Sequence, residues 1–205
     1  MSTGPRGRAG RLWHRRRIAA AEAALDLLER KLGILRDEQD GLHRLARATS
    51  EDWERRCREA DRLLNRATLL GGRRVLPLAS TGDRAELTVE HAVLMGVTYP
   101  RRIVFDLPDR PAPSPSGTAV APARRACRAA LEAACAHAAA TAAAAAVDAE
   151  VAATRQRVRA IERRRLPRLR AALTEIEAAL EEREREDGAR LRLLAGREGR
   201  PDGRP

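Results

Sequence analysis

Apolar residues recur at alternating steps of three and four residues along the first third of the chain. The series runs through Ile18, Ala21, Leu25, Leu28, Leu32 and Leu35, and then through Leu42, Ala46, Trp53, Ala60, Leu63, Ala67 and Leu70. A spacing of this kind, kept over many turns, is typical of a coiled coil. It predicts a helix over residues 11–70 that stops at Gly71-Gly72.

A second helical pattern covers residues 123–195. Its first part is dominated by alanine, which has high helix propensity but buries little apolar area, so close but weak packing is expected there. The later part has larger apolar residues, namely Val147, Val151, Val158, Ile161, Leu169, Leu173, Ile176 and Leu180, followed by Leu191 and Leu194. The eight-residue step from Ile161 to Leu169 departs from a heptad and brackets Pro167, which indicates a local change of supercoil.

The segment between the helices, residues 71–122, has a different composition. The stretches AELTVEHAVLMGVTYP and RRIVFDLP carry β-branched residues and are bounded by proline and glycine, so they predict a small β-hairpin or an irregular head. Residues 108–122 are rich in proline and serine and predict a mobile connector. Residues 1–10 and 196–205 are expected to be a disordered basic leader and a disordered tail.

Together these patterns predict a mainly α protein, in which the N-terminal and C-terminal helices form a long antiparallel two-helix coiled coil. Both termini would then lie at one end. Placing Leu12 opposite Leu194 brings Trp53 near Thr154 and sets the acidic residues at 37–40 against the arginines of 163–170. This charge match is weak support for the register, because exposed ion pairs contribute only ~0–1 kcal/mol each.

The chain is strongly basic, with a formal net charge of +11, and 34% of its residues are charged while only 2% are aromatic. A basic chain can bind nucleic acid, anionic lipid or an acidic protein. Arginine supplies nearly all of the positive charge, and this bias also fits GC-rich codons. No stacking aromatic residues or DNA-reading motif accompany the arginines. A basic coiled-coil nucleic-acid-binding protein is therefore the alternative rather than the leading hypothesis.

Residues for catalysis or metal binding are sparse. The only lysine, Lys31, lies within a helical segment rather than in a phosphate-binding loop, and the four histidines are scattered. Cys57, Cys127 and Cys135 show no paired spacing, which predicts reduced, buried thiols. No cofactor or metal site is expected. No apolar run approaches the ~20 residues that span a bilayer, and no signal peptide is visible, so a cytoplasmic protein is expected.

The C-terminal segment contains the run RVRAIE at residues 157–162, the pair Leu166-Pro167, and LEEREREDGARLR at residues 180–192. In order and spacing these resemble the last helix of the D subunit of the V-type and A-type rotary ATPases. That helix carries a run like RVNALE, a hydrophobic-proline pair, and LEEREREE before RLK. Arg159 stands here in place of the family's asparagine.

The N-terminal stretch GRLWHRRRIAAAEAALDLLERKL is similar to the first helix of the same family. The matching features are Leu12, the basic cluster at 15–17, the pair Leu27-Leu28, and Lys31. Three positions depart from the family pattern: Ala24 replaces a common glycine, Glu29 a lysine, and Gly33 an acid. The resemblance covers about the first 45 and the last 50 residues.

The resemblance implies a non-catalytic central-stalk rotor subunit of a V/A-type ATP synthase or ATPase, transmitting torque between the nucleotide-hydrolysing ring and the membrane ion-translocating rotor. The implied partners are the catalytic and nucleotide-binding ring subunits (A and B type), the F subunit and the membrane-side coupling subunit (C or d type). Direct nucleic-acid binding is not expected, and membrane contact would come only through the complex.

The resemblance and the apolar spacing together suggest roles for particular residues. The candidate ring contacts are Arg11, Arg15, Arg16, Arg17, Arg190 and Arg192. The coiled-coil seam would consist of Ile18, Leu25, Leu28, Leu32, Leu35, Val158, Ile161, Leu169, Leu173, Ile176 and Leu180. Pro167 would introduce a bend that curves the stalk.

Overall fold

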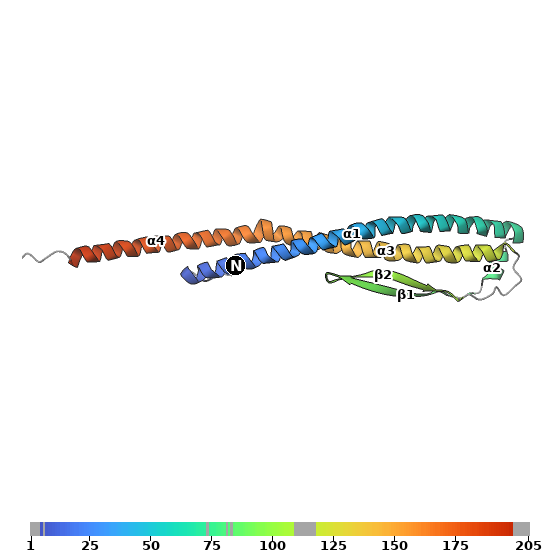
Figure 1. Cartoon of the computed structure of the whole chain (residues 1–205), viewed down its shortest axis with the longest axis horizontal. Helices are drawn as coiled ribbons and strands as arrows, with labels where there is room; N and C mark the ends of the chain where they lie inside the picture. The colour runs from blue at the N-terminus through green and yellow to red at the C-terminus, as the bar shows by residue number, and fades with distance from the viewer. Residues whose placement is uncertain are drawn as a thin grey trace, which may run out of the picture. The chain divides into compact units, whose positions relative to one another are not determined.

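The computed structural model describes residues 5, 7–72, 74–80, 82, 84–108 and 118–198, with the backbone alone for residues 195–198. Its elements, in chain order, are α1 (Gly7–Gly71), α2 (Val75–Ala79), β1 (Glu86–Leu94), β2 (Val97–Asp106), α3 (Val120–Ala160), the π-helical segment η1 (Ile161–Arg165) and α4 (Leu166–Glu198), as Figure 1 shows. The predicted class is confirmed: long N-terminal and C-terminal helices with a two-stranded antiparallel hairpin between them.

The helices extend beyond the bounds predicted from sequence. α1 begins at Gly7, inside the segment expected to be a disordered leader, and α3 begins at Val120, inside the expected connector. Pro122 also falls within that connector, but proline is tolerated in the first turn of a helix, where its missing N–H has no partner to lose. The rest of the connector, residues 109–117, and the tail 199–205 lie outside the described residues.

The end of α1 agrees with the sequence prediction. The helix stops at Gly71, and Gly72 has a φ of +74°, the left-handed conformation that glycine adopts readily at a helix C-terminus.

The chain forms two compact units. One comprises Lys31–Ala153, and the other comprises Met1–Arg30 together with Thr154–Pro205.

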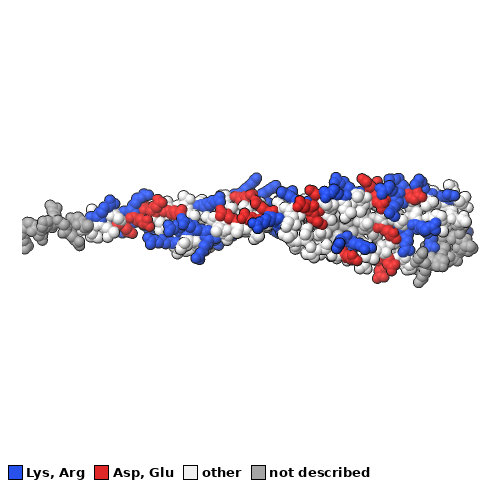
Figure 2. All heavy atoms as spheres, in the orientation of Figure 1, with Lys and Arg blue, Asp and Glu red and all other residues white. Residues whose placement is uncertain are grey.

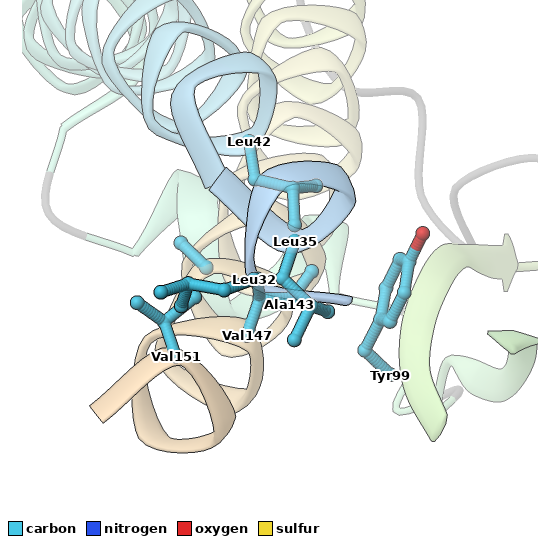
Figure 3. Close-up of a cluster of buried hydrophobic side chains, with 8 residues drawn as sticks. Leu32, Leu35, Leu42, Tyr99, Ala143, Val147 and Val151 are labelled. Atoms are coloured by element: carbon cyan, nitrogen blue, oxygen red, sulfur yellow. The ribbon is translucent and has the colours of Figure 1, made fainter. Parts of the chain in front are cut away.

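The core of the Lys31–Ala153 unit is built from three elements, as the close-up in Figure 3 shows. Its buried residues are Leu32, Leu35 and Leu42 of α1, Tyr99 of β2, and Ala143, Ala144, Val147 and Val151 of α3. Ala92, Leu94 and Val97 of the hairpin pack against them. Because the alanine side chains of α3 are small, the hairpin can approach the helix closely. Ala143 and Ala144 of the alanine-rich stretch are thus packed against both α1 and the hairpin.

The backbone conformation of the hairpin turn fits the residues that form it. β1 and β2 pair antiparallel from Glu86 opposite Asp106 to Leu94 opposite Val97, and the connecting Met95 and Gly96 have φ values of 50° and 83°. Two successive positive φ angles are the signature of the tight turns that suit hairpins. The register shifts at Glu90/His91, where a β-bulge also accommodates Pro100, a residue that cannot donate a ladder hydrogen bond.

In the other unit, α1 and α4 run antiparallel and are linked by ion pairs. Arg8 lies 3.5 Å from Glu184, Arg15 lies 2.7 Å from Glu177, and Arg170 lies 2.8 Å from Glu22. The residues predicted for the seam in this unit are all at least partly buried. Val158 is buried, while Ile18, Leu25, Leu28, Ile161, Leu169, Leu173, Ile176 and Leu180 are half-buried.

The register inferred from charge is wrong. Trp53 stacks on His137, with ring centroids 5.4 Å apart, rather than lying near Thr154, and Arg170 pairs with Glu22 rather than with the acidic residues at 37–40. The expected register required both helices to end together, whereas residues 185–198 of α4 continue past the level of Arg8. Exposed ion pairs are too weak to select a register, so burial of apolar side chains decides it.

This register also corrects the ends of the apolar series. Leu191 and Leu194 are 67% and 58% exposed, because α4 has no opposing α1 residue at that level. Leu70, the last member of the first series, is 70% exposed at the end of α1. The apolar spacing alone does not distinguish these three residues from the buried members of the series.

The π-helical segment η1 lies directly before Leu166 and Pro167. The backbone N–H of Leu166 donates to the carbonyl of Ile161, five residues earlier, at the end of η1. A π-helical turn holds one more residue than an α-helical turn would. This extra residue accounts for the eight-residue step from Ile161 to Leu169 that precedes the return of the seam on α4.

Candidate functional site

The four arginines of the basic cluster near the start of α1 have two kinds of surroundings. Arg15 is paired with Glu177 of α4, and Arg11 is half-buried, with an Nε atom that has no hydrogen-bond partner among the described residues. Arg16 and Arg17 are exposed, and the guanidinium of Arg17 lies 4.6 Å from the centroid of the Trp13 ring. Arg16 and Arg17 are therefore the members of this cluster available to a partner.

A buried histidine lies beside this cluster and was missed in the sequence, where the four histidines looked merely scattered. His14 is 8% exposed, and its ring packs edge-on to Trp13 at 4.7 Å. Its Nδ1 and the Nε of Arg11 are the buried side-chain polar atoms without a partner in the described part of the chain. They lie one helical turn apart on α1.

The second basic group lies on the part of α4 that continues past α1. Arg190 is 3.8 Å from Asp187, and the Nε of Arg192 donates to the carbonyl of Gly188, so both arginines contact only their own helix among the described residues. Arg190 is thirteen residues beyond Glu177, the partner of Arg15, which places the two groups about 20 Å apart along α4. The structure does not bring the six candidate arginines together.

Polar contacts between helices flank the core of the Lys31–Ala153 unit. Lys31 Nζ is 2.7 Å from Glu150, while Gln39 and His43 reach the same oxygen of Asp148 at 2.7 and 2.9 Å. Such contacts fix how two helices align along and around each other. Sequence patterns did not reveal them, because they depend on a register that the apolar spacing alone left open.

Tyr99 joins the hairpin to α1, since its hydroxyl donates to Glu38 at 2.8 Å. Burial raises the pKa of Tyr99, and the hydrogen bond and negative charge of Glu38 raise it further, while Arg101 lowers it. The tyrosine therefore remains a neutral donor at physiological pH.

We expect Asp148 to make the stability of the contact between α1 and α3 depend on pH. Burial raises the pKa of its carboxyl, but the hydrogen bonds from Gln39 and His43 and the charge of His43 outweigh this and lower the pKa below its ordinary value. A carboxyl with a depressed folded-state pKa contributes stability above its unfolded-state pKa and loses that contribution as the pH falls through the folded-state value. We expect the melting temperature of the full chain to fall as the pH drops below about 4, and Asp148→Asn to make this fall shallower.

The test is a pair of melting curves, recorded from about pH 7 to about pH 2.5 so that they span the carboxylate titration range, for the full chain and for Asp148→Asn. Asp187→Asn is the matched control. Asp187 is highly exposed, and its ion pair is a long one of 3.8 Å to Arg190 on the same helix. Parallel pH profiles for the parent and Asp148→Asn would show that the Asp148 contacts carry no net stability.

The three cysteines are free, as predicted, but they are half-buried rather than fully buried. Burial raises the pKa of the Cys127 thiol, and Asp61 and Cys57 raise it further, which makes it a poor nucleophile. Across the described ranges, no group of three or more histidine, cysteine or acidic side chains could hold a metal ion.

The surface charge is mixed rather than uniformly basic. In Figure 2, acidic and basic side chains alternate in small groups over the visible face. Many of them pair within one helix, for example Arg56 with Asp52 and Arg185 with Glu182. A continuous basic surface of the kind that follows a phosphate backbone is not visible on this face.

A family model that describes the D subunit of ATP synthase matches residues 12–196 of the chain. The chain belongs to this family. A search of curated proteins gives no significant match. The model of the ATP synthase D subunit extends across the hairpin and α3, which the motif resemblance did not reach. The chain is thus a subunit of a rotary ATPase, working within a membrane-associated complex together with other ATPase subunits.

The hydropathy of the C-terminal helix of this ATP synthase D subunit family member differs from what was expected from sequence. By length and composition alone, the continuous helix Val120–Leu194 includes an 18-residue window apolar enough to cross a membrane, a kind of run that the sequence analysis did not find. Alanine accounts for the difference, because it is apolar but small. Ala139, Ala140, Ala143 and Ala144 of this helix are buried in the protein, and 39% of the apolar window as a whole is buried.

Proposed function

We propose that the chain is the central-stalk rotor subunit of a V/A-type ATP synthase or ATPase and that it transmits torque between the nucleotide-hydrolysing ring and the membrane ion-translocating rotor. The observation that carries this proposal is the family match along residues 12–196, combined with helix pairs that are tied by side-chain contacts in each unit. Torque passes through two helices only if they do not slide, and cross-helix contacts oppose sliding.

The chain itself performs no catalysis in this proposal. Its single lysine, the residue that a phosphate-binding loop would need, is held by Glu150 at 2.7 Å on the side of a long helix. ATP would be hydrolysed or made by the A-type and B-type ring subunits. The F subunit and the membrane-side coupling subunit would bind elsewhere on the stalk, on the cytoplasmic side of the membrane.

The parts facing the ring would be Arg16 and Arg17 of α1 and the exposed continuation of α4. That continuation carries Arg190 and Arg192 together with Leu191, Leu193 and Leu194, which are 67%, 72% and 58% exposed. A single helix with exposed leucines and arginines suits a surface that a surrounding ring covers. Arg11 and Arg15 would hold α1 against α4 instead.

Pro167 and the preceding η1 segment would shape the stalk by interrupting its helical hydrogen bonds. Pro167→Ala should restore an N–H group and raise the free energy of unfolding by up to about 3 kcal/mol. If the interruption serves torque transmission, the same change should lower ATP turnover of the reconstituted complex without preventing assembly. Arg168→Ala, at the exposed neighbouring position, is the matched control for both measurements. Unchanged turnover with a stabilised chain would contradict a mechanical role for the proline.

The proposal is tested by co-expressing the chain with its cognate ring subunits and the cognate F subunit, and then sizing the complex and assaying its ATPase activity. One copy per ring, with turnover that requires the chain, would support it. Failure to associate, together with a salt-dependent gel shift of duplex DNA, would favour the alternative of a basic coiled-coil nucleic-acid-binding protein.

A further inference from the structure

A two-part cavity lies in the Lys31–Ala153 unit, where α1 ends and α3 begins (Figure 1). Its parts have volumes of about 290 and 210 Å³ and share four residues, two that follow β2 and two on α3. Residues of α1 and α2 complete the lining. We call this cavity the α3 pocket. Its defining residues are Leu64 of α1, Leu76 and Ala79 of α2, and Val120, Arg124 and Arg128 of α3.

The larger part of the α3 pocket is lined mainly by apolar residues. Ala79, Val120 and Ala123 line it, and all three are buried members of the cluster that also contains Ala67. Because alanine side chains are small, they leave a space here that larger side chains would fill. Leu131 lines the same part and is 49% exposed. An apolar chain bound in this space would remove apolar surface from water, which is favourable.

The charged lining of the α3 pocket is basic. Among the described residues that line either part, Arg124, Arg125 and Arg128 carry charge and none is acidic. Arg128 lies 3.4 Å from Glu132 on its own helix, with both side chains partly exposed, and such a pair is weak enough to admit a competing anion. Asp61 of α1, whose charge reaches Cys127, lines neither part. The pocket is therefore complementary to a negatively charged group.

We propose that the α3 pocket binds a single-chain amphiphile with an anionic head, either a carboxylate or a phosphate. The apolar chain would lie over Ala79, Val120 and Ala123, and the head would accept hydrogen bonds from the arginines. The planar guanidinium group of arginine donates two parallel N–H bonds to a carboxylate or a phosphate, so an anionic head is favoured over a neutral or cationic one. This inference goes beyond the proposed function and does not rest on it, because every lining residue belongs to one unit of this chain.

A thiol in the lining gives a direct test, because Cys127 lines the larger part of the pocket. The reduced full chain is labelled with N-ethylmaleimide at about pH 8.5, and mass spectrometry follows each cysteine. Dodecanoate or dodecyl phosphate, below its critical micelle concentration, should slow labelling of Cys127 about tenfold at about ten times its Kd. Cys135 lines neither part and is the internal control, whose rate should stay unchanged. Dodecyltrimethylammonium and inorganic phosphate, which lack the anionic head and the chain respectively, should not protect Cys127.

Two variants of the full chain test the recognition of the head. The double change Arg125→Gln with Arg128→Gln should raise about tenfold the concentration of dodecyl phosphate that half-protects Cys127, because charge-assisted hydrogen bonds are lost. Arg55→Gln with Arg58→Gln is the matched control, since these exposed arginines of α1 also pair with acids on their own helix and lie off the pocket. It should leave that concentration unchanged.

A second pair of variants tests the recognition of the chain. Leu131→Asn should weaken protection of Cys127 by both dodecyl compounds, because it removes apolar surface from the lining. Leu69→Asn is the control, since Leu69 is 86% exposed on α1 and lines neither part of the pocket. The melting temperature of each variant without amphiphile checks that it folds.

Several outcomes would overturn the α3 pocket as an amphiphile site. Equal protection of Cys127 by the cationic and anionic dodecyl compounds, or equal effects of the test and control variants, would show non-specific binding. A Cys127 thiol that reacts only after unfolding, even without amphiphile, would show that the chain itself fills the pocket. Co-sedimentation with vesicles of anionic phospholipid, without protection by soluble amphiphile, would assign the arginines to a membrane surface instead. None of these results bears on the rotor function, which is tested by assembly and turnover of the complex.

Discussion

Replacing Tyr99 with alanine is expected to release the β-hairpin from the helices and to lower the free energy of unfolding by about 3–5 kcal/mol. The Tyr99 side chain is 8% exposed and forms the centre of the contact between β2 and the cluster of Leu35, Ala143 and Val147. An isolated two-stranded hairpin is only marginally stable in water. Loss of the ring should therefore expose both strands. Hydrogen exchange of residues 86–106 and chemical denaturation measure the two effects.

Tyr99→Phe is the matched control, because it keeps the ring and removes only the hydroxyl that donates to Glu38. Glu38 is half-buried and can bind water instead, so a cost of about 0.5–1.5 kcal/mol is expected. The hairpin should stay protected in this variant. Protection of residues 86–106 that survives in Tyr99→Ala would mean that other hairpin contacts, such as those of Leu94 and Val97, hold it in place.

The second large effect is expected at Leu35, which is completely buried between α1, α3 and the hairpin. Leu35→Ala should destabilise the full chain by about 2–5 kcal/mol, because the lost apolar contacts leave a cavity. The thermal midpoint and the denaturant midpoint should both fall. In the complex, a weakened helix pair should also transmit less torque and so lower ATP turnover.

Leu27→Ala provides the comparison, since Leu27 lies on the same helix but is 65% exposed. Its effect should stay within about 0.5 kcal/mol, as for most surface substitutions. Equal destabilisation by the two changes would show that the packing around Leu35 is not what holds the two helices together.

Much of the fold could be predicted from local patterns. The spacing from Ile18 to Leu35 is long and regular, and the glycine pair at 71–72 is an unambiguous stop, so α1 followed from the sequence. The hairpin was predicted as one of two possibilities, because β-branched residues and turn residues indicate strands without fixing their pairing. The ends of the helices were less accessible, since Pro122 fits both a connector and the first turn of a helix.

The register was not predictable from charge. Several arginines of α4 could face several acids of α1 at nearly equal free energy, and only the apolar packing distinguishes the alternatives. The polar contacts of Asp148 and the contact of Tyr99 with Glu38 depend on how α1 lies against α3 and the hairpin, which local patterns do not fix. The buried position of His14 could not be read from local patterns either. The phase change at Ile161–Leu169 was visible in the sequence, but its form as a π-helical turn was not.

The candidate ring contacts were chosen by resemblance, and the structure distinguishes among them. Arg15 makes an ion pair within the chain and Arg11 is half-buried, whereas Arg190 and Arg192 lie on a part of α4 that no α1 residue accompanies. Sequence alone treats these arginines as equivalent, because their exposure depends on where the opposing helix ends.

The most direct test of the account is to observe the chain during ATP hydrolysis. The reconstituted complex is immobilised through its ring subunits, and a reporter bead is attached to the chain at the exposed position of Ala48 on α1. The account predicts unidirectional, stepwise rotation of the bead that depends on ATP. A bead that stays fixed relative to the ring while the same complexes hydrolyse ATP would contradict a rotor function for this chain.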